Sequence, residues 1–136
     1  MTADKADLLI VDDQVGVRML ISEALLEIGY VAAQASRGWE ALEKLKEKAY
    51  RLILLDVKMP GISGVETLNE IRKISPEVPV VLMTAYEDLY IMEEAERLGV
   101  RHCLRKPFDL EELRTLTRQL IPRVDDVGCC AANETC

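Results

Sequence analysis

The sequence lacks any long hydrophobic segment. Hydrophobic residues make up 49% of the 136 residues, but no apolar run approaches the roughly 18 residues that a membrane span requires. The first seven residues, MTADKAD, also lack the apolar core of a secretory signal peptide. We therefore expect a cytoplasmic protein that is not associated with a membrane.

Positive charge is also scarce. The chain has 17 Lys and Arg against 24 Asp and Glu, which gives a formal net charge of −7. Binding to nucleic-acid phosphates requires clustered Lys and Arg, so we expect no direct nucleic-acid binding by this domain. Any DNA-binding function would belong to another domain or another chain.

The four cysteines do not form the pattern of a disulfide framework. Cys103 lies in the body of the chain, whereas the other three fall within the last eight residues, 129–136. This distribution favours a reducing compartment. The terminal cysteines have no nearby histidine and no second paired motif, so disorder is the favoured interpretation of the tail and a metal site the less favoured one.

Short apolar runs alternate with helical patterns along the chain. The run Leu52 to Leu55, followed by Asp56, suits a strand buried on both faces, although a buried helix segment can have the same pattern. The other predicted strands are 8–11, 30–33, 78–83 and 102–104. Five strands alternating with five helices predict an α/β fold with a doubly wound parallel sheet, covered by helices on both faces.

The helices have recognisable ends. Gly29 and Gly99 are expected to end the first and fourth helices, and Ser63 and Asp109 to cap the third and fifth. The first helix places these apolar residues at helical spacing: Val17, Leu20, Ile21, Ala24, Leu25 and Ile28. We expect one domain over residues 8–121, with an N-terminal extension (1–7) and a C-terminal tail or linker (122–136).

Polar residues follow four of the predicted strands. Because ligands bind outside the carboxyl ends of parallel strands, these residues should meet at one edge of the sheet. They are Asp12, Asp13, Asp56, Thr84 and Lys106. Three adjacent carboxylates repel one another unless a cation joins them, and Mg²⁺ accepts carboxylates together with water and phosphate oxygens. Asp56 is then a plausible nucleophile towards phosphorus.

Each of these residues alone also has an ordinary interpretation. An Asp pair before a helix often only caps it, and an acid at a strand end often only meets solvent. Trp39 and the methionines are better interpreted as packing groups than as a cofactor site, and His102 as an incidental strand residue. The joint arrangement is what predicts a functional site.

Four segments, LLIVDDQ, LILLDVKMPGISG, VVLMTAY and LRKPFD, resemble the motifs of the receiver domain of bacterial two-component response regulators. Within that family, the chain most resembles the single-domain receiver of the sporulation phosphorelay. The resemblance implies a flavodoxin-like fold with strand order 2-1-3-4-5. It further implies a phosphoacceptor signalling domain with only weak self-dephosphorylation, rather than an enzyme that turns over substrates.

The resemblance also implies roles for individual residues. Asp56 would accept a phosphoryl group from a phosphohistidine of a sensor histidine kinase or a histidine phosphotransferase, and a downstream protein would recognise the modified surface. Mg²⁺, or alternatively Mn²⁺, would be held by Asp13, Asp56 and the backbone carbonyl of Lys58, with Asp12 acting partly through water.

Further roles concern the phosphoryl oxygens and their surroundings. Lys106 and Thr84 would contact those oxygens, and the bond between Lys106 and Pro107 would be cis. Lys58 and Tyr86 would line the approach of hydrolytic water.

One position departs from the family pattern. Cys103 stands where many receivers have an aromatic residue that turns inward on activation. His102 does not substitute for it, because neighbouring strand residues point to opposite faces. We therefore expect the signal to depend on charge and loop order around residues 84–88.

Three hypotheses follow. The first is a stand-alone phosphorelay intermediate, and the second is the N-terminal receiver of a multidomain transcriptional regulator. The third is an α/β enzyme, such as an aspartate-nucleophile phosphatase or a flavin protein. Asp56 has no second Asp two residues later and no Gly-rich loop follows the first strand, which disfavours the third hypothesis.

Overall fold

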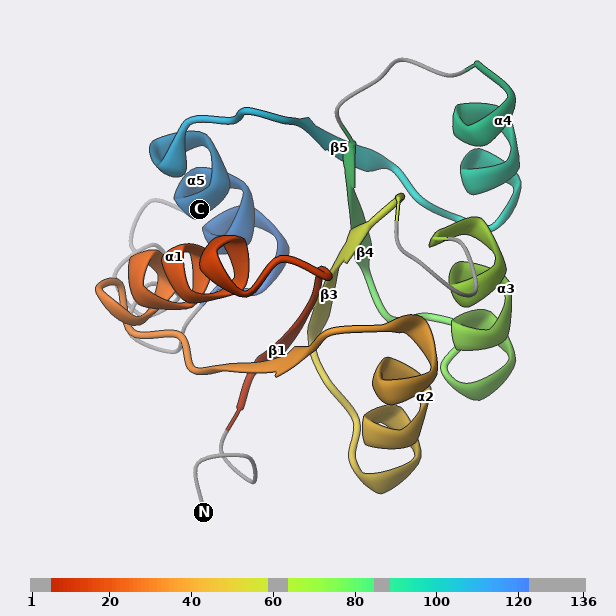
Figure 1. The fold of residues 1–136 in the computed structure, drawn as a ribbon, viewed down its shortest axis with the longest axis horizontal. Coiled ribbons are helices and arrows are strands. Elements are labelled where there is room, and N and C mark those ends of the chain that lie inside the picture. The colour runs from red at the N-terminus through yellow and green to blue at the C-terminus, as the bar shows by residue number, and fades with distance from the viewer. Residues whose placement is uncertain (1–5, 59–63, 85–88, 123–136) are drawn as a thin grey trace, which may run out of the picture.

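A five-stranded parallel sheet lies between two layers of helices (Figure 1). The computed structural model describes residues 6–58, 64–84 and 89–122. The strands are β1 (Leu8–Val11), β2 (Ala32–Ala35), β3 (Leu52–Asp56), β4 (Val80–Thr84) and β5 (His102–Arg105), in the order β2-β1-β3-β4-β5. The predicted α/β class and strand order are confirmed.

The helices alternate with the strands along the chain. They are α1 (Val15–Leu26), α2 (Gly38–Glu47), α3 (Gly64–Ile74), α4 (Leu89–Arg97) and α5 (Leu110–Leu120). Helices α1 and α5 cover one face of the sheet, and α2, α3 and α4 cover the other (Figure 1). Within the described ranges, no helix is long and apolar enough to span a membrane.

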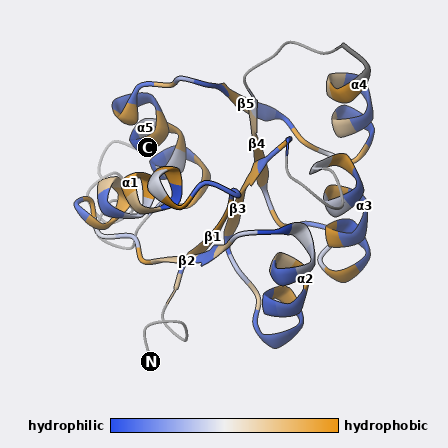
Figure 2. Ribbon diagram, viewed as in Figure 1, coloured by the Kyte–Doolittle hydropathy of each residue, from blue (hydrophilic) through white to orange (hydrophobic). Residues whose placement is uncertain are grey.

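The central strands are buried on both faces. Successive residues of β3 join opposite core clusters: Ile53 and Leu55 pack on the α2–α4 side, whereas Leu52 and Leu54 pack on the α1–α5 side. Figure 2 shows the strands of the sheet as mostly hydrophobic, whereas the helices combine hydrophobic and hydrophilic residues. Each fully buried Leu contributes roughly 1.5–3 kcal/mol, so this alternation fixes the strand register strongly.

Strand β2 begins two residues later than predicted, at Ala32. Gly29 has a positive φ of 93°, and the Tyr30 backbone N–H donates to the Leu25 carbonyl at 2.9 Å, so Tyr30 completes the end of α1. The Tyr30 hydroxyl then donates to the Ile121 carbonyl at 2.7 Å. Tyr30 therefore ties the start of the edge strand to the end of α5.

Strand β4 also begins two residues later than predicted, at Val80. The residue before it is Pro79, which has no N–H for the sheet, and the Val78 carbonyl accepts a hydrogen bond from Arg72 Nη1 at 2.6 Å. Strand β5 is one residue longer than predicted and ends at Arg105.

Helix α1 exposes apolar residues to solvent. The expected burial of Ile21, Ala24 and Leu25 is confirmed. Leu20, at helical spacing with them, is instead 54% exposed. The other large apolar residues exposed on this helix are Val15 (58%), Met19 (52%) and Leu26 (60%). The helix is apolar around most of its circumference, so periodicity alone could not indicate which side would be buried.

The predicted caps have different outcomes. Asp109 is the N-cap of α5, and its Oδ1 accepts from the Glu111 backbone N–H at 2.9 Å, as predicted. The Ser63 cap lies outside the described residues.

Gly64 packs against the end of β3. Its backbone N–H donates to the Val57 carbonyl at 3.0 Å. A Cβ at this position would lie 2.6 Å from Val57 Cα and 2.8 Å from the Asp56 carbonyl oxygen. Both neighbours are backbone atoms, so a side chain could enter only by moving the segment that carries Asp56.

We therefore expect Gly64→Ala to lower the free energy of unfolding by about 1–3 kcal/mol, the usual cost of overpacking. The control is Gly16→Ala in α1, where an added Cβ meets nothing within 4 Å. That change should leave stability unaltered or raise it by up to about 1 kcal/mol. Urea denaturation measures both, and equal effects of the two substitutions would contradict the close packing of Gly64.

Candidate functional site

The strand register brings the predicted site residues to one edge of the sheet. Val11 pairs with Leu55, so the next residues, Asp12 and Asp56, lie side by side. Thr84 at the end of β4 pairs with Arg105, the residue before Lys106. We call the following group the acidic site: Asp12, Asp13, Asp56, Lys58, Thr84 and Lys106.

Three carboxylates form the centre of the acidic site. Asp12, Asp13 and Asp56 each offer an oxygen, and these oxygens all lie within 4.8 Å of one another. Asp12 and Asp56 are buried, whereas Asp13 is exposed. Helix capping does not explain the Asp pair, because the N-cap of α1 is Gln14. A set of carboxylate oxygens open to solvent on one side fits Mg²⁺, which keeps water and phosphate oxygens among its ligands.

Lys106 provides the positive charge inside this cluster. Its Nζ lies 2.8 Å from Asp12 Oδ2 and 3.5 Å from Asp56 Oδ1. The Lys106 backbone N–H donates to the Thr84 carbonyl at 2.7 Å, and the peptide bond between Lys106 and Pro107 is cis, as the family resemblance implies. The ammonium is therefore held at the site and is closer to Asp12 than to Asp56.

The pKa of Asp56 is raised to about 6. Burial of the carboxyl is the largest cause, and the negative charge of Asp12 is the next. Lys106 and the Lys58 backbone N–H, which donates to Asp56 Oδ1 at 3.2 Å, lower this pKa but do not offset the rise. Burial and the neighbouring carboxylate thus both disfavour the ionised form of Asp56.

A cavity of about 300 Å³ opens over Asp56. It is lined by Asp13, Gln14, Asp56, Lys58, Thr84 and Lys106. Gln14 was not among the predicted site residues, although its position directly after the Asp pair in LLIVDDQ could have indicated it. Its backbone N–H donates to Asp12 Oδ1 at 2.9 Å. The arrangement places an acid, a hydroxyl and an ammonium around a space that could admit a phosphoryl group.

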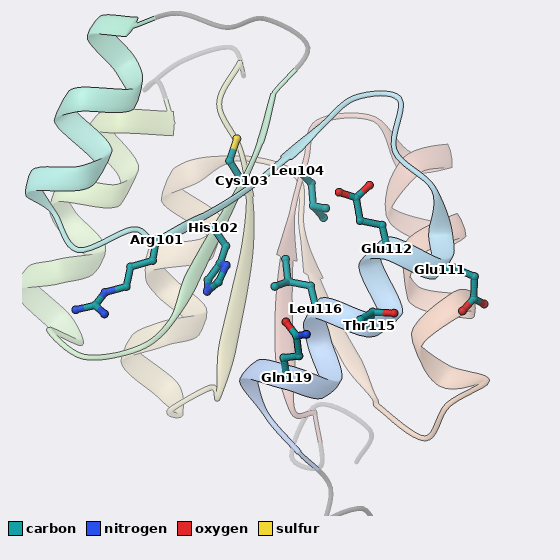
Figure 3. Close-up of a pocket in the computed structure, with 9 residues that line it drawn as sticks. All are labelled: Arg101, His102, Cys103, Leu104, Glu111, Glu112, Thr115, Leu116 and Gln119. Carbon is teal, nitrogen blue, oxygen red and sulfur yellow. The ribbon is translucent and has the colours of Figure 1, made fainter. Parts of the chain in front are cut away.

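Two other residues from the sequence analysis lie away from this cavity. Figure 3 shows His102 and Cys103 pointing away from each other on β5, at a hollow of about 550 Å³ between β5 and α5. That hollow shares no residue with the acidic site. Cys103 packs against the core cluster on the α2–α4 side, and Tyr86 lies outside the described residues.

The raised pKa of Asp56 makes stability depend on pH. Between the ordinary value of 3.8 and about 6, the folded protein binds more protons than the unfolded chain. The stability therefore falls as the pH rises through this window. Without divalent cations, we expect Asp56→Asn to be more stable than the unaltered protein by about 3 kcal/mol near neutral pH.

Urea denaturation in the presence of a chelator, at several pH values, measures this difference. It should shrink to nothing below about pH 3, where the carboxyl is protonated in both states. A difference that does not vary with pH would show that Asp56 is not the group responsible.

Known proteins are similar to this chain. The family model of the response regulator receiver domain matches residues 8–118. Sporulation initiation phosphotransferase F of Bacillus subtilis is 38% identical over 115 residues, which cover 85% of this chain and 93% of that protein. The transcriptional regulatory protein ZraR of Klebsiella oxytoca is 38% identical over 121 residues, 88% of this chain but only 27% of that protein.

A solved structure gives the same result for the fold. The chemotaxis protein CheY4 of Vibrio cholerae has a TM-score of 0.79 at 29% identity, over 85% of this chain and 98% of that one. The matched residues include all five strands and the whole acidic site. The chain therefore belongs to the response regulator receiver domain family.

Proposed function

We propose that this domain accepts a phosphoryl group on Asp56 from a phosphohistidine, in a Mg²⁺-dependent reaction, and signals through its altered surface in the cytoplasm. The observation that carries this proposal is a buried carboxylate facing a cavity, with two further carboxylates and an ammonium within reach. Membership of the receiver family supports the same function.

The transfer requires an ionised nucleophile. With a pKa of about 6, the Asp56 carboxyl is mostly ionised at neutral pH. One of its oxygens would bond to phosphorus as the bond from phosphorus to the donor imidazole nitrogen breaks, which leaves an acyl phosphate and a free imidazole. Lys106 and Thr84 line the same cavity and would contact the phosphoryl oxygens.

The cation would be held by the three carboxylates and, as the family resemblance implies, by the Lys58 carbonyl. When bound, Mg²⁺ supplies positive charge that neutralises the phosphoryl oxygens. A cation would also neutralise the three carboxylates, whose oxygens lie within 4.8 Å of one another and of which Lys106 contacts only Asp12 and Asp56 in the described residues. Mn²⁺ accepts similar oxygen ligands and is the alternative.

Incubation with Mg²⁺ and acetyl phosphate should add one phosphoryl group, detected by intact mass. Asp56→Asn should abolish the addition, because it removes the nucleophile. Asp109→Asn is a matched control, since that carboxylate caps α5 and is outside the acidic site. Labelling that persists in Asp56→Asn, or that needs no divalent cation, would contradict the proposal.

The domain could act as a protein on its own or as one part of a multidomain regulator. We favour a stand-alone phosphorelay intermediate, because the match to phosphotransferase F covers 93% of that protein. The second candidate is the receiver of a multidomain transcriptional regulator, because the match to ZraR covers 27% of that protein. In either case we propose a receiver over residues 8–121 flanked by an extension and a tail or linker. The full reading frame distinguishes the two candidates.

The exposed side of α1 supports a docking role. Val15, Met19 and Leu26 are each more than half exposed, and their spacing places them along one side of the helix. Helix α1 begins directly after Gln14, which lines the cavity over Asp56. We propose that the partner that presents the phosphohistidine packs an apolar surface against this side of α1.

Met19→Glu is therefore expected to reduce phosphotransfer from a phosphorylated histidine kinase or phosphotransferase by about tenfold or more, because it places a charge in an apolar contact. Labelling by acetyl phosphate should not change, since that small donor needs no docking surface. Ile74→Glu, at an exposed apolar position on α3, is the control and should transfer normally. Equal losses with both donors would indicate damage to the site rather than to docking.

A further inference from the structure

We propose that Arg18 is a positioning residue that fixes the main chain of Asp12 and thereby sets the affinity of the acidic site for its divalent cation. This inference rests on the proposed function, because it takes Asp12 as part of the cation site. Arg18 does not line the cavity over Asp56. It would act from behind the cluster, through Asp12.

One guanidinium group joins three segments of the chain. Arg18 belongs to α1, and its Nη1 donates to the Asp12 carbonyl oxygen at 2.7 Å. Its Nε donates to Gln34 Oε1 on β2 at 3.1 Å. Because the guanidinium is planar and rigid, two simultaneous hydrogen bonds fix the end of β1 relative to both α1 and β2.

Asp12 is held through every polar group that it has. Its backbone N–H donates to the Ala35 carbonyl at 3.1 Å, and its Oδ1 accepts from the Gln14 backbone N–H at 2.9 Å. Its Oδ2 accepts from Lys106 Nζ at 2.8 Å. The hydrogen bond from Arg18 satisfies the remaining group, the backbone carbonyl.

These four contacts are not equivalent with respect to cation binding. Lys106 is itself part of the acidic site, so its replacement would change the charge in the cavity. The contacts from Ala35 and Gln14 come from the backbone and remain when side chains are changed. Arg18 is therefore the one side chain outside the cavity that holds Asp12, among the residues that the structure describes.

The contribution of Arg18 is positional rather than electrostatic. Arg18 contacts the Asp12 backbone carbonyl rather than its carboxylate, and it does not line the cavity over Asp56. A cation requires its ligand oxygens at defined distances, and groups that orient a ligand typically change metal affinity by about 10–100-fold when removed. Loss of Arg18 should loosen the backbone of Asp12 without changing the set of carboxylates.

The test is a calorimetric titration with Mn²⁺ and with Mg²⁺, accompanied by urea denaturation. Arg18→Met should weaken cation binding about tenfold, because it keeps the aliphatic stem but removes both hydrogen bonds. Arg18→Lys can reach the Asp12 carbonyl but not Gln34 at the same time, so it should recover part of the affinity. Gln34→Leu removes only the second anchor and should fall between Arg18→Met and the unaltered protein.

Arg114→Met is the matched control. Arg114 is also a partly buried arginine that donates to a backbone carbonyl of α1: its Nε lies 3.1 Å from the Ala24 oxygen. It lies on α5 and contacts Glu27 and Glu111 rather than the acidic site. This variant should lose stability and keep its cation affinity.

Unchanged affinity in Arg18→Met, or an equal loss in Arg114→Met, would overturn the inference. If the unaltered protein binds neither cation, the proposed function fails and this inference fails with it. Normal cation binding by the unaltered protein together with normal binding by Arg18→Met would leave the proposed function intact and refute only the role of Arg18.

Discussion

The acidic site depends on the burial of two neighbouring carboxylates, Asp12 and Asp56, at the edge of the sheet. Asp12 and Asp56 both lie within 3.5 Å of Lys106 Nζ, and Asp12 holds the closer contact. Burial of the carboxyl is the main reason that the pKa of Asp56 rises to about 6, and the negative charge of Asp12 adds to it, although Lys106 opposes the rise. An additional cation at this position would relieve the repulsion and keep Asp56 ionised. The proposed cation site and the proposed acceptor role of Asp56 both rely on this arrangement.

The apolar strands make this crowded arrangement possible. Asp56 comes directly after four buried residues, and a slip of one residue in β3 would exchange the two faces of the strand. The cost of exposing those side chains fixes the register, and the register places Asp56 beside Asp12. At the carboxyl end of β3, close packing of Gly64 on Val57 and the Asp56 carbonyl leaves the segment little room to move. Hydrophobic burial thus provides the free energy that keeps like charges together.

The sequence predicted those features that depend on local pattern and parallel topology. The apolar runs and their polar boundaries place four site residues at or directly after strand ends: Asp12, Asp56, Thr84 and Lys106. The start of β2 could not be predicted in the same way, because it depends on the hydrogen bonds that end α1. The contact between Lys106 and Asp12, and the reach of Arg18 to the end of β1, depend on side chains from separate elements. Periodicity contains no information about such contacts.

Helix α1 shows why one element can serve two purposes. Leu20 shares the helical spacing of the buried residues Ile21, Ala24 and Leu25, yet it is exposed, as Met19 also is. A helix that is apolar on nearly all sides can bury only some of them, and among the described residues the exposed side of α1 contributes little to packing. Arg18, the neighbour of Met19, turns instead towards Asp12 and Gln34. Met19 and Arg18 are adjacent on α1, so a partner that packs against Met19 would lie beside the turn of helix from which Arg18 contacts Asp12.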